Sequence, residues 1–295
     1  MSHNICLLGG GTRLAAHLGV LQAIGEQGVR VGAWSGASAG SLIAAVMASG
    51  HTLEQAADLM FDTDYRRFFE FRPAALWRGY GLCSGRRFEK WLDQILDKRR
   101  FADLDVALSV VATDVDTGDP CIFSPWTTPN VRLATAVRCS IGIPGVFSLR
   151  KFRGSRLIDG SLAAVQPSVL FPFPEVDSIL VRLLRGRTPA SMAIRKRRGL
   201  ASYVRRVASL VLDATEDLYS PEHWARVISI ETGRHSSIDF RISHADRQEL
   251  YHMGHRQAAR SLNDSVDEFL AICKGCQSAE INDVDRVSDR EIQTV

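Results

Sequence analysis

The stretch VGAWSGASAGSLIAAVMASG, residues 31–50, constrains the fold more than any other part of this 295-residue chain. It begins as a strand-like run, turns through residues 36–40 and continues as an apolar helix. Gly36 and Gly40 flank Ser38, which completes a Gly-x-Ser-x-Gly sequence. A strand, such a turn and a helix together form the corner on which hydrolases expose a nucleophilic hydroxyl, and larger side chains than glycine would collide there. The pattern therefore predicts an α/β architecture with Ser38 as a candidate nucleophile.

Strand-like and helix-like segments alternate along most of the chain. The predicted strands are residues 4–10, 29–36, 106–116, 121–125, 155–160 and 178–184. The predicted helices include residues 13–28, 41–50 and 133–142. Strands separated by helices imply a mostly parallel sheet that is covered on both faces. We therefore predict an α/β fold in the form of a three-layer α/β/α sandwich.

A single domain over residues 1–270 accounts for most of this pattern. Residues 51–100 and 187–226 interrupt the alternation, and we interpret them as helical insertions, candidates for a lid or a membrane-facing surface. Residues 271–295 form a polar tail that we expect to be flexible.

The composition, with 45% hydrophobic and 23% charged residues, is that of an ordinary globular protein. A formal net charge of +3 is small and says little about partners, so electrostatic arguments must rest on local clustering. We expect no nucleic acid as a partner. Six scattered cysteines predict free thiols in a reducing compartment. Cys273 and Cys276 form a lone CxxC without a second pair of ligands nearby, which favours two tail thiols over a metal site.

Neither a membrane span nor a secretory signal is predicted. No apolar run approaches the ~20 residues that a membrane-spanning helix needs. The N-terminal segment NICLLGGG lacks a basic leader and runs directly into glycines. We expect a cytoplasmic location, with secretion by a route without a cleaved signal left open. The oligomeric state is left open as well.

The loop Gly9-Gly10-Gly11-Thr12-Arg13 follows the first predicted strand and begins the first helix. Consecutive glycines let backbone N–H groups point outward beside a helix N-terminus, where negative charge is favoured. Such a loop holds a phosphate or a developing oxyanion. A dinucleotide site requires glycine where Leu14 stands, and an acidic residue about 20 positions further on, where the chain has Arg30 and Val31. We therefore favour an oxyanion site over a nucleotide site, with a purely structural turn as the alternative.

Two kinds of base are available to activate Ser38. In SRLIDGSLAAVQP an apolar strand runs into Asp159-Gly160, which projects one carboxylate from a strand end onto a tight turn. An aspartate within reach of a serine hydroxyl accepts its proton without any histidine. A conventional triad instead requires a later histidine, and five follow in the order that it needs: His223, His235, His244, His252 and His255. None of the five stands in a glycine-flanked or strand-end context.

Five blocks of sequence occur together in the order and spacing of one family. The blocks are LLGGGTRLAAHLGVLQAIGEQG, SGASAGSLIAA, VVATDVDTGDPCIF, AVRCSIGIPGVF and LIDGS. With these blocks the chain resembles the patatin-like phospholipases, and the matching positions are dense from residue 5 to about residue 175. Residues 239–260 look like the family's closing helix.

The resemblance implies hydrolysis of lipid acyl esters, of the phospholipase A or lysophospholipase type, by a serine–aspartate dyad. Carried over by position, Ser38 is the nucleophile and Asp159 is its base. The N–H groups of Gly10, Gly11 and Thr12 become the oxyanion hole. The motifs are completed by Gly9, Arg13, Gly36, Gly40 and Gly160. A lipid or phospholipid is then the substrate, and this chemistry requires no metal or organic cofactor.

Two positions depart from the family's pattern. Relatives usually carry glycine where Leu14 stands, so Leu14 either shifts the oxyanion donors or forms a wall of the acyl pocket. Ser161 replaces a glycine or alanine after Asp-Gly, and we expect little effect from so small a residue. Arg13 and His17 match the pattern and lie one helix turn apart, which favours bracing of the loop over chemistry.

Basic residues gather near the second insertion. Between residues 185 and 206 the basic residues are Arg185, Arg187, Arg195, Lys196, Arg197, Arg198, Arg205 and Arg206, and no acidic residue occurs there. Apolar residues follow at helical spacing: Leu200, Tyr203, Val204, Val207, Leu210 and Val211. The pattern is typical of peripheral contact with an anionic membrane, and equally of a solvated helix packed on the domain. The first insertion contains the segment DYRRFFEFRPAALWRGYGL, either a lipid-contacting lid or a hairpin that covers the core.

Two other classes of function fit parts of the pattern. A catalytically silent family member would act as a binding or scaffold module, which the presence of both Ser38 and Asp159 disfavours. A histidine-dependent esterase of the α/β-hydrolase fold is the second alternative, but its serine normally follows several strands and Ser38 follows only two. Transfer of the acyl group to an alcohol other than water is compatible with the same dyad.

Overall fold

The structure is a computed structural model that describes residues 2–68, 70, 80–163, 178–186, 203, 207, 210–211 and 226–263. The chain divides into two compact units, Met1–Ala258 and Ala259–Val295. The elements below belong to the first unit, and the described part of the second, residues 259–263, is helical. The predicted tail, the predicted domain limit at residue 270 and most of the predicted insertion at 187–226 lie outside the described residues.

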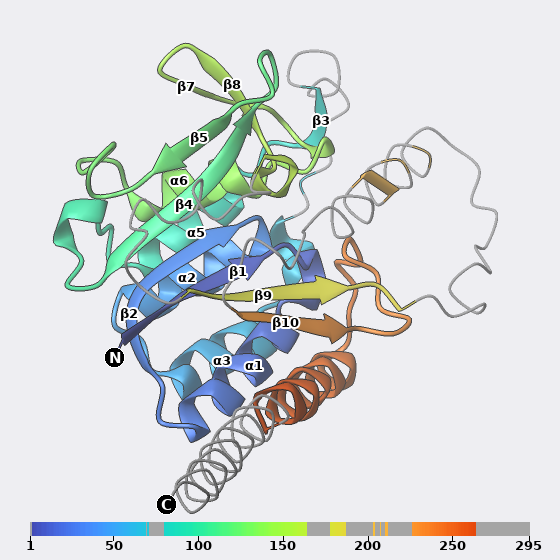
Figure 1. Ribbon diagram of the computed structural model, residues 1–295. Coiled ribbons are helices and arrows are strands. Elements are labelled where there is room, and N and C mark those ends of the chain that lie inside the picture. The colour runs from blue at the N-terminus through green and yellow to red at the C-terminus, as the bar shows by residue number, and fades with distance from the viewer. Residues whose placement is uncertain are drawn as a thin grey trace, which may run out of the picture. The chain divides into compact units, whose positions relative to one another are not determined.

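An eight-stranded sheet runs through the first unit in the order β10-β9-β1-β2-β4-β8-β7, with β5 paired to β4 outside this path (Figure 1). Its strands are β1 (Ser2–Leu8), β2 (Arg30–Ala37), β4 (Ala107–Asp114), β5 (Pro120–Phe123), β7 (Arg150–Phe152), β8 (Ser155–Ile158), β9 (Ser178–Leu184) and β10 (Arg226–Glu231). The run from β10 to β4 is parallel, whereas β5, β7 and β8 pair in antiparallel fashion. A separate parallel pair joins β3 (Gly81–Cys83) to β6 (Gly145–Phe147). The prediction of a mostly parallel α/β sheet is confirmed.

Helices follow the parallel strands as a β-α-β succession requires. The α-helices are α1 (Ala15–Glu26), α2 (Ala39–Ala48), α3 (Leu53–Asp62), α5 (Arg86–Ile95) and α6 (Leu133–Ser140), and residues 244–258 are helical as well. Single turns of 3-10 helix are η1 (Gly11–Arg13), η2 (Tyr65–Phe68), η3 (Phe101–Asp103) and η4 (Gly160–Leu162). The first predicted insertion thus contains α3, η2 and α5, together with the short β3. Within the described residues, no helix combines the length and the apolarity needed to cross a bilayer.

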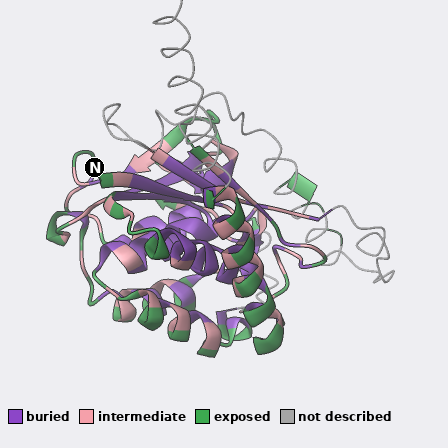
Figure 2. Cartoon of the chain, turned by 60° about the horizontal axis from the view of Figure 1, so that its bottom comes forward, coloured by how far each residue is buried: buried purple, intermediate pink, exposed green. Residues whose placement is uncertain are grey.

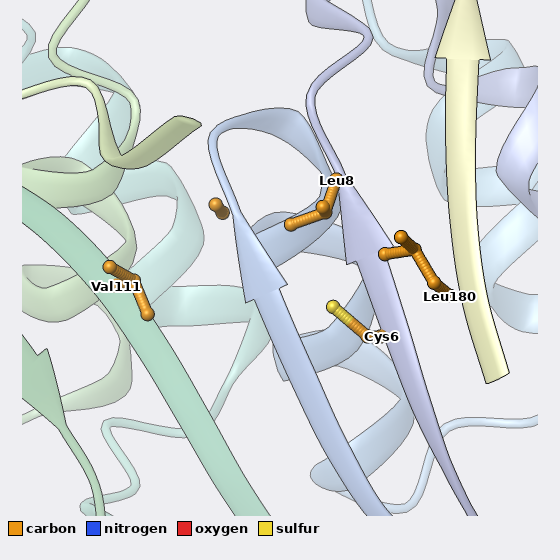
Figure 3. Close-up of a cluster of buried hydrophobic side chains, with 5 residues drawn as sticks. Cys6, Leu8, Val111 and Leu180 are labelled. Carbon is orange, nitrogen blue, oxygen red and sulfur yellow. The ribbon is translucent and has the colours of Figure 1, made fainter. Parts of the chain in front are cut away.

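Many residues of the strands and of the helices packed against them are buried, as the purple segments of Figure 2 show. Leu7 of β1 faces α2, because a Cβ atom on Gly40 would lie 3.0 Å from the Leu7 Cβ. Side chains alternate along a strand, so Cys6 and Leu8 face the other side. There they cluster with residues of three neighbouring strands (Figure 3), namely Ala37, Val111 and Leu180. All five are at most 2% exposed, so the sheet is covered on both faces as a three-layer sandwich requires.

Three strand ends meet at one edge of this sheet. Leu8 pairs in register with Ala37, and the Gly9 N–H donates to the Ala37 carbonyl at 3.2 Å. Strand β8 runs antiparallel to β4 with Ile158 opposite Thr113, so the residues that follow β8 run back along β4 toward Val111, which pairs with Ala37 at the end of β2. Parallel α/β sheets place their functional sites at this edge. The three predicted motif segments are therefore neighbours in space.

Candidate active site

Ser38 stands on the turn between β2 and α2 in a backbone conformation that non-glycine residues rarely adopt, with φ 53° and ψ −133°. Both flanking glycines are required sterically. A Cβ on Gly36 would lie 2.6 Å from the Ser41 Cα, and one on Gly40 would lie 2.0 Å from the Leu7 carbonyl oxygen. Strain of this kind costs about 1–3 kcal/mol and concentrates at functional sites. The turn has the form of a nucleophile elbow.

The Ser38 hydroxyl donates a hydrogen bond to Asp159 Oδ2 at 2.7 Å. The other carboxylate oxygen, Oδ1, accepts the Ser161 hydroxyl at 2.5 Å and the Ser161 N–H at 3.1 Å. Asp159 is fully buried, and burial raises the pKa of its carboxyl above the usual value, against the opposing effect of the hydrogen bonds from Ser161 and Ser38. A carboxylate with a raised pKa is a stronger base toward a hydroxyl proton. Ser161, expected to matter little, thus holds the carboxylate in place.

Two further hydroxyl groups, which no sequence motif predicted, form hydrogen bonds with the backbone of Ser38 and Asp159. Ser140, at the end of α6, accepts the Ser38 N–H at 2.9 Å and donates to the Val111 carbonyl at 2.6 Å. Thr113 on β4 donates to the Asp159 carbonyl at 2.7 Å. Both segments contain other polar residues, so nothing in the sequence marks these two hydroxyls. The serine turn and the aspartate turn are thereby tied to β4 and α6.

The glycine loop after β1 bends through three consecutive residues with positive φ: Gly9 at 61°, Gly10 at 101° and Gly11 at 54°. The N–H groups of Gly10 and Gly11 donate no hydrogen bond to any residue in the described part of the chain. The Thr12 N–H, by contrast, donates to the Ser237 carbonyl at 2.8 Å. This differs from the expectation that Thr12 contributes an oxyanion donor, because a distant segment approaches the loop and engages that N–H. Gly10 and Gly11 remain as candidate donors.

The segment 232–240 that engages Thr12 was not anticipated as part of the site. The Thr12 hydroxyl donates to the Ser236 carbonyl at 2.9 Å and accepts the Asp239 N–H at 3.2 Å. A Cβ on Gly11 would lie 1.8 Å from the Ser237 carbonyl oxygen, so the two segments touch at their backbones. No spacing in the sequence reports a contact between residues more than 220 positions apart.

Arg13 and His17 contact backbone carbonyl groups of the glycine loop with their side chains. Arg13 is fully buried, and it donates from Nε to the Gly10 carbonyl at 3.1 Å and from a terminal nitrogen to the Thr232 hydroxyl at 2.9 Å. His17 Nε2 lies 3.3 Å from the Gly9 carbonyl oxygen. Burial is the main cause that lowers the pKa of His17 to about 4, so the ring is neutral near pH 7 and donates from one nitrogen. These contacts agree with the bracing role expected for both residues.

A cavity opens beside the serine turn and the glycine loop, with an empty volume of about 550 Å³ that includes solvent at its mouth. Its polar lining residues are Thr12 and Ser237. The aliphatic part of the lining includes Leu14, Ala39, Leu42, Ile141 and Ile143. The aromatic part is Tyr65, Phe68, Phe88, Trp91, Phe147 and Phe240. The largely apolar lining suits a hydrocarbon chain. Leu14 is therefore a wall of this cavity, and four of the aromatic rings come from the first insertion.

The histidines among the described residues form no hydrogen bond with Ser38. His255 Nε2 lies 2.8 Å from Glu26 at the surface, and the ring of His244 stacks near Phe61. The ring of His252 lies against Tyr251. His223 lies outside the described residues.

His235, Asp246 and Glu249 form a group within the described residues whose ligand atoms are close enough for a metal ion. The two ring nitrogens face different carboxylates, since Nδ1 lies 4.0 Å from Asp246 and Nε2 lies 3.4 Å from Glu249. Arg234 approaches the same two carboxylates at 3.8 Å and 3.5 Å. The two carboxylates thus lie within ion-pair distance of Arg234 as well as of the buried His235.

Comparison with known proteins agrees with this geometry. The family model described as patatin-like phospholipase matches residues 5–168. The chain is 25% identical over 268 residues to the uncharacterized protein R571 of Acanthamoeba polyphaga mimivirus, covering 85% of this chain and 90% of that protein. It is 30% identical over 179 residues to the uncharacterized NTE family protein Rv1063c of Mycobacterium tuberculosis, covering 60% of this chain but only 46% of that protein. The crystal structure of VipD from Legionella pneumophila matches with a TM-score of 0.67 at 17% identity, over 90% of this chain and 67% of that chain, which shows a shared fold.

Proposed function

The chain belongs to the patatin-like phospholipase family, and on that premise we propose that it is a lipid acyl hydrolase of the phospholipase A or lysophospholipase type. Ser38 is the proposed nucleophile and Asp159 its base. The observation that carries this choice of residues is the 2.7 Å hydrogen bond from Ser38 Oγ to the buried carboxylate of Asp159. Family membership supports lipid hydrolysis in general.

In the proposed reaction, Asp159 accepts the hydroxyl proton of Ser38 as the Ser38 oxygen attacks the ester carbonyl carbon. The carbonyl oxygen becomes an oxyanion that the N–H groups of Gly10 and Gly11 stabilise. When the C–O bond breaks, the alcohol leaves with the proton from Asp159, and an acyl-serine remains. Water then gives a proton to Asp159 and attacks the acyl-serine. The carboxylic acid departs as that proton returns to Ser38 Oγ.

The strained backbone at Ser38 favours this proposal over a catalytically silent binding module. A residue that served only in packing would gain nothing from a φ of 53° held by two obligatory glycines. The proposal needs no histidine, because the Ser38 hydroxyl donates its hydrogen bond directly to the Asp159 carboxylate.

The test is hydrolysis of a panel of phospholipids, lysophospholipids and neutral lipids with products identified by mass. Ser38→Ala and Asp159→Asn should each lose hydrolysis by about 10³-fold or more. Ser49→Ala is the matched control, because Ser49 is also a buried serine of the α2 region but its hydroxyl bonds to the Val46 carbonyl and the His51 ring, away from Asp159. Retained activity in Ser38→Ala, or equal loss in Ser49→Ala, contradicts the assignment.

We also propose that residues 185–206 and the apolar positions beside them contact an anionic membrane surface. Most of this segment lies outside the described residues. What supports the proposal is that Tyr203, Val207, Leu210 and Val211 are helical and exposed, by 68%, 40%, 49% and 38% respectively. Their spacing places them on one face of a helix, and exposed apolar faces beside basic residues bind at anionic interfaces.

Sedimentation with vesicles tests this contact. Vesicles that contain phosphatidylserine should bind more protein than vesicles of phosphatidylcholine alone, and the double substitution Tyr203→Ser with Leu210→Ser should weaken the binding. Val115→Ser is the control, because Val115 is 43% exposed on another segment. Equal weak binding to both vesicle types removes the membrane contact while leaving the dyad untouched.

A further inference from the structure

Leu14 stands where the glycine loop passes into α1, and its side chain helps to line the cavity beside the candidate nucleophile. Its backbone has φ −53° and ψ −21°, ordinary right-handed helical values. The position therefore needs no glycine, and a leucine occupies it without backbone strain. The side chain is 5% exposed, so it is fixed in the wall.

Two further lining residues belong to the candidate active site. Gly11 is a candidate oxyanion donor, and Ala39 follows Ser38 directly. A substrate carbonyl carbon attacked by Ser38, with its oxygen on the glycine-loop N–H groups, must lie between these small residues. Leu14 comes only three positions after Gly11, so it is a bulky side chain close to the first carbons of the acyl chain.

Aromatic side chains form another part of the cavity lining. The Phe68 ring centroid lies 5.5 Å from that of Phe88 and 4.9 Å from that of Trp91, so the three rings pack as one group. The Tyr65 hydroxyl donates a hydrogen bond to the Met60 carbonyl at 2.9 Å. Phe68 and Phe88 carry no polar group, so this part of the lining suits an extended hydrocarbon chain.

We propose that Leu14 makes the site selective for acyl chains that are unbranched next to the ester carbonyl. This rests on the proposed function and deepens it, because it names the acyl group that the same site accepts. A methyl branch on the carbon beside the carbonyl points toward the Leu14 side chain and is excluded by it. One extra methyl group in such a pocket changes selectivity by about 10–200-fold.

The test compares 4-nitrophenyl octanoate with 4-nitrophenyl 2-methyloctanoate in the full-length protein and its variants. Wild type should prefer the unbranched ester by about tenfold or more in kcat/KM. Leu14→Ala should lower that preference at least fivefold, mainly by raising kcat/KM for the branched ester. Leu14→Val, which removes less volume, keeps the test valid should the alanine variant fail to fold, and it should lower the preference in the same direction.

Leu21→Ala is the matched control. Leu21 lies two turns further along α1, is 6% exposed and does not line the cavity. It should lose stability as a buried leucine does, with the preference for the unbranched ester unchanged.

Three results overturn the inference. An unchanged preference in both Leu14 variants removes Leu14 as a selector while the proposed function stands. Equal loss on both esters in the Leu14 variants assigns the residue to positioning of the glycine loop instead. Wild-type hydrolysis that equals that of Ser38→Ala overturns the proposed function and this inference together.

Discussion

The two halves of the candidate site are held in place in different ways. The Ser38–Asp159 pair is fixed by side-chain hydroxyls on adjacent strand and helix ends, among them Ser140 and Thr113. The glycine loop offers backbone N–H groups, and its outer side is held by the segment 232–240 from the far end of the chain. The first half depends on short motifs, and the second on a contact between distant segments. Substitutions in the two halves should therefore lower activity for different reasons.

Gly11→Ala should have the largest effect on the loop half. A Cβ at this residue, where φ is 54°, would lie 1.8 Å from the Ser237 carbonyl oxygen, so the loop must move away from its position. Displaced oxyanion donors cost about 100–1,000-fold in kcat, and we expect a loss of this size although Ser38 and Asp159 are unchanged. Gly9→Ala is the matched control, because its φ is also positive, at 61°, but a Cβ there meets nothing within 4 Å. Steady-state kinetics on one lipid ester decides: similar losses in both variants would mean that strain alone, and not the contact with 232–240, sets activity.

Thr12→Val should have a smaller effect, about tenfold in kcat, with KM changed less. The substitution removes the hydroxyl that joins the Ser236 carbonyl to the Asp239 N–H, but it keeps the backbone bond to Ser237. Thr12→Ser retains the hydroxyl and should restore most of the activity. If the serine variant is as slow as the valine variant, the hydroxyl does not position the loop.

Asp159→Asn should change the stability and the activity of the protein in opposite directions. Burial raises the pKa of Asp159, so the folded protein binds this proton more tightly than the unfolded chain does. The contribution of Asp159 to stability is therefore greatest at low pH and declines as the pH rises from the unfolded pKa to the folded pKa. At pH 7 the asparagine variant should melt at a higher temperature than wild type while lacking activity. Thermal melts at pH 5 and pH 7 check the sign, since the stability advantage of the variant should be smaller at pH 5.

The same raised pKa predicts the pH dependence of catalysis. Asp159 acts as a base only when ionised, so kcat/KM should fall on the acidic side as the carboxyl takes up its proton. A profile that stays flat down to the ordinary pKa of an aspartate would contradict a raised value.

Ser237→Ala should have the smallest effect. The Ser237 hydroxyl is buried and has no hydrogen-bond partner within the described residues, whereas the Ser237 carbonyl holds the Thr12 N–H. Removing an unsatisfied buried hydroxyl should leave stability unchanged or raise it by about 1 kcal/mol, with activity within twofold of wild type. A denaturant melt measures the first quantity and a kinetic assay the second. A tenfold loss of activity would show that the hydroxyl, and not only the backbone, serves the site.

The sequence predicted those features that depend on local pattern. The hydrophobic periodicity of short stretches predicted β1, α1, β2 and α2. Glycines at the ends of these stretches marked where each strand or helix ends. Ser38 was predicted as a nucleophile because it stands on a glycine turn at the end of an apolar strand, whereas Asp159, also on a glycine turn, was predicted as its base through the family resemblance. The antiparallel pairing of β8 with β4 was not anticipated, since pairing direction is not written in a strand's own composition.

What the sequence did not reveal depends on contacts between distant residues. Ser140 and Thr113 each share their element with another hydroxyl residue, and nothing in their neighbours distinguishes them from other buried serines and threonines. The hydrogen bond from the Thr12 N–H to the Ser237 carbonyl joins residues that lie far apart in the sequence. Four of the six aromatic residues that line the cavity come from the first insertion, which the sequence left open between a lid and a core-covering hairpin.

Trapping the acyl-enzyme tests the central claim most directly. The protein is mixed with a lipid ester, quenched in acid within the first turnover, digested and analysed by mass spectrometry. The account predicts an added acyl mass on the peptide that contains Ser38, absent in Ser38→Ala and strongly reduced in Asp159→Asn. An acyl group on any other residue, or turnover of the ester with no adduct on Ser38 at any quench time, would contradict it.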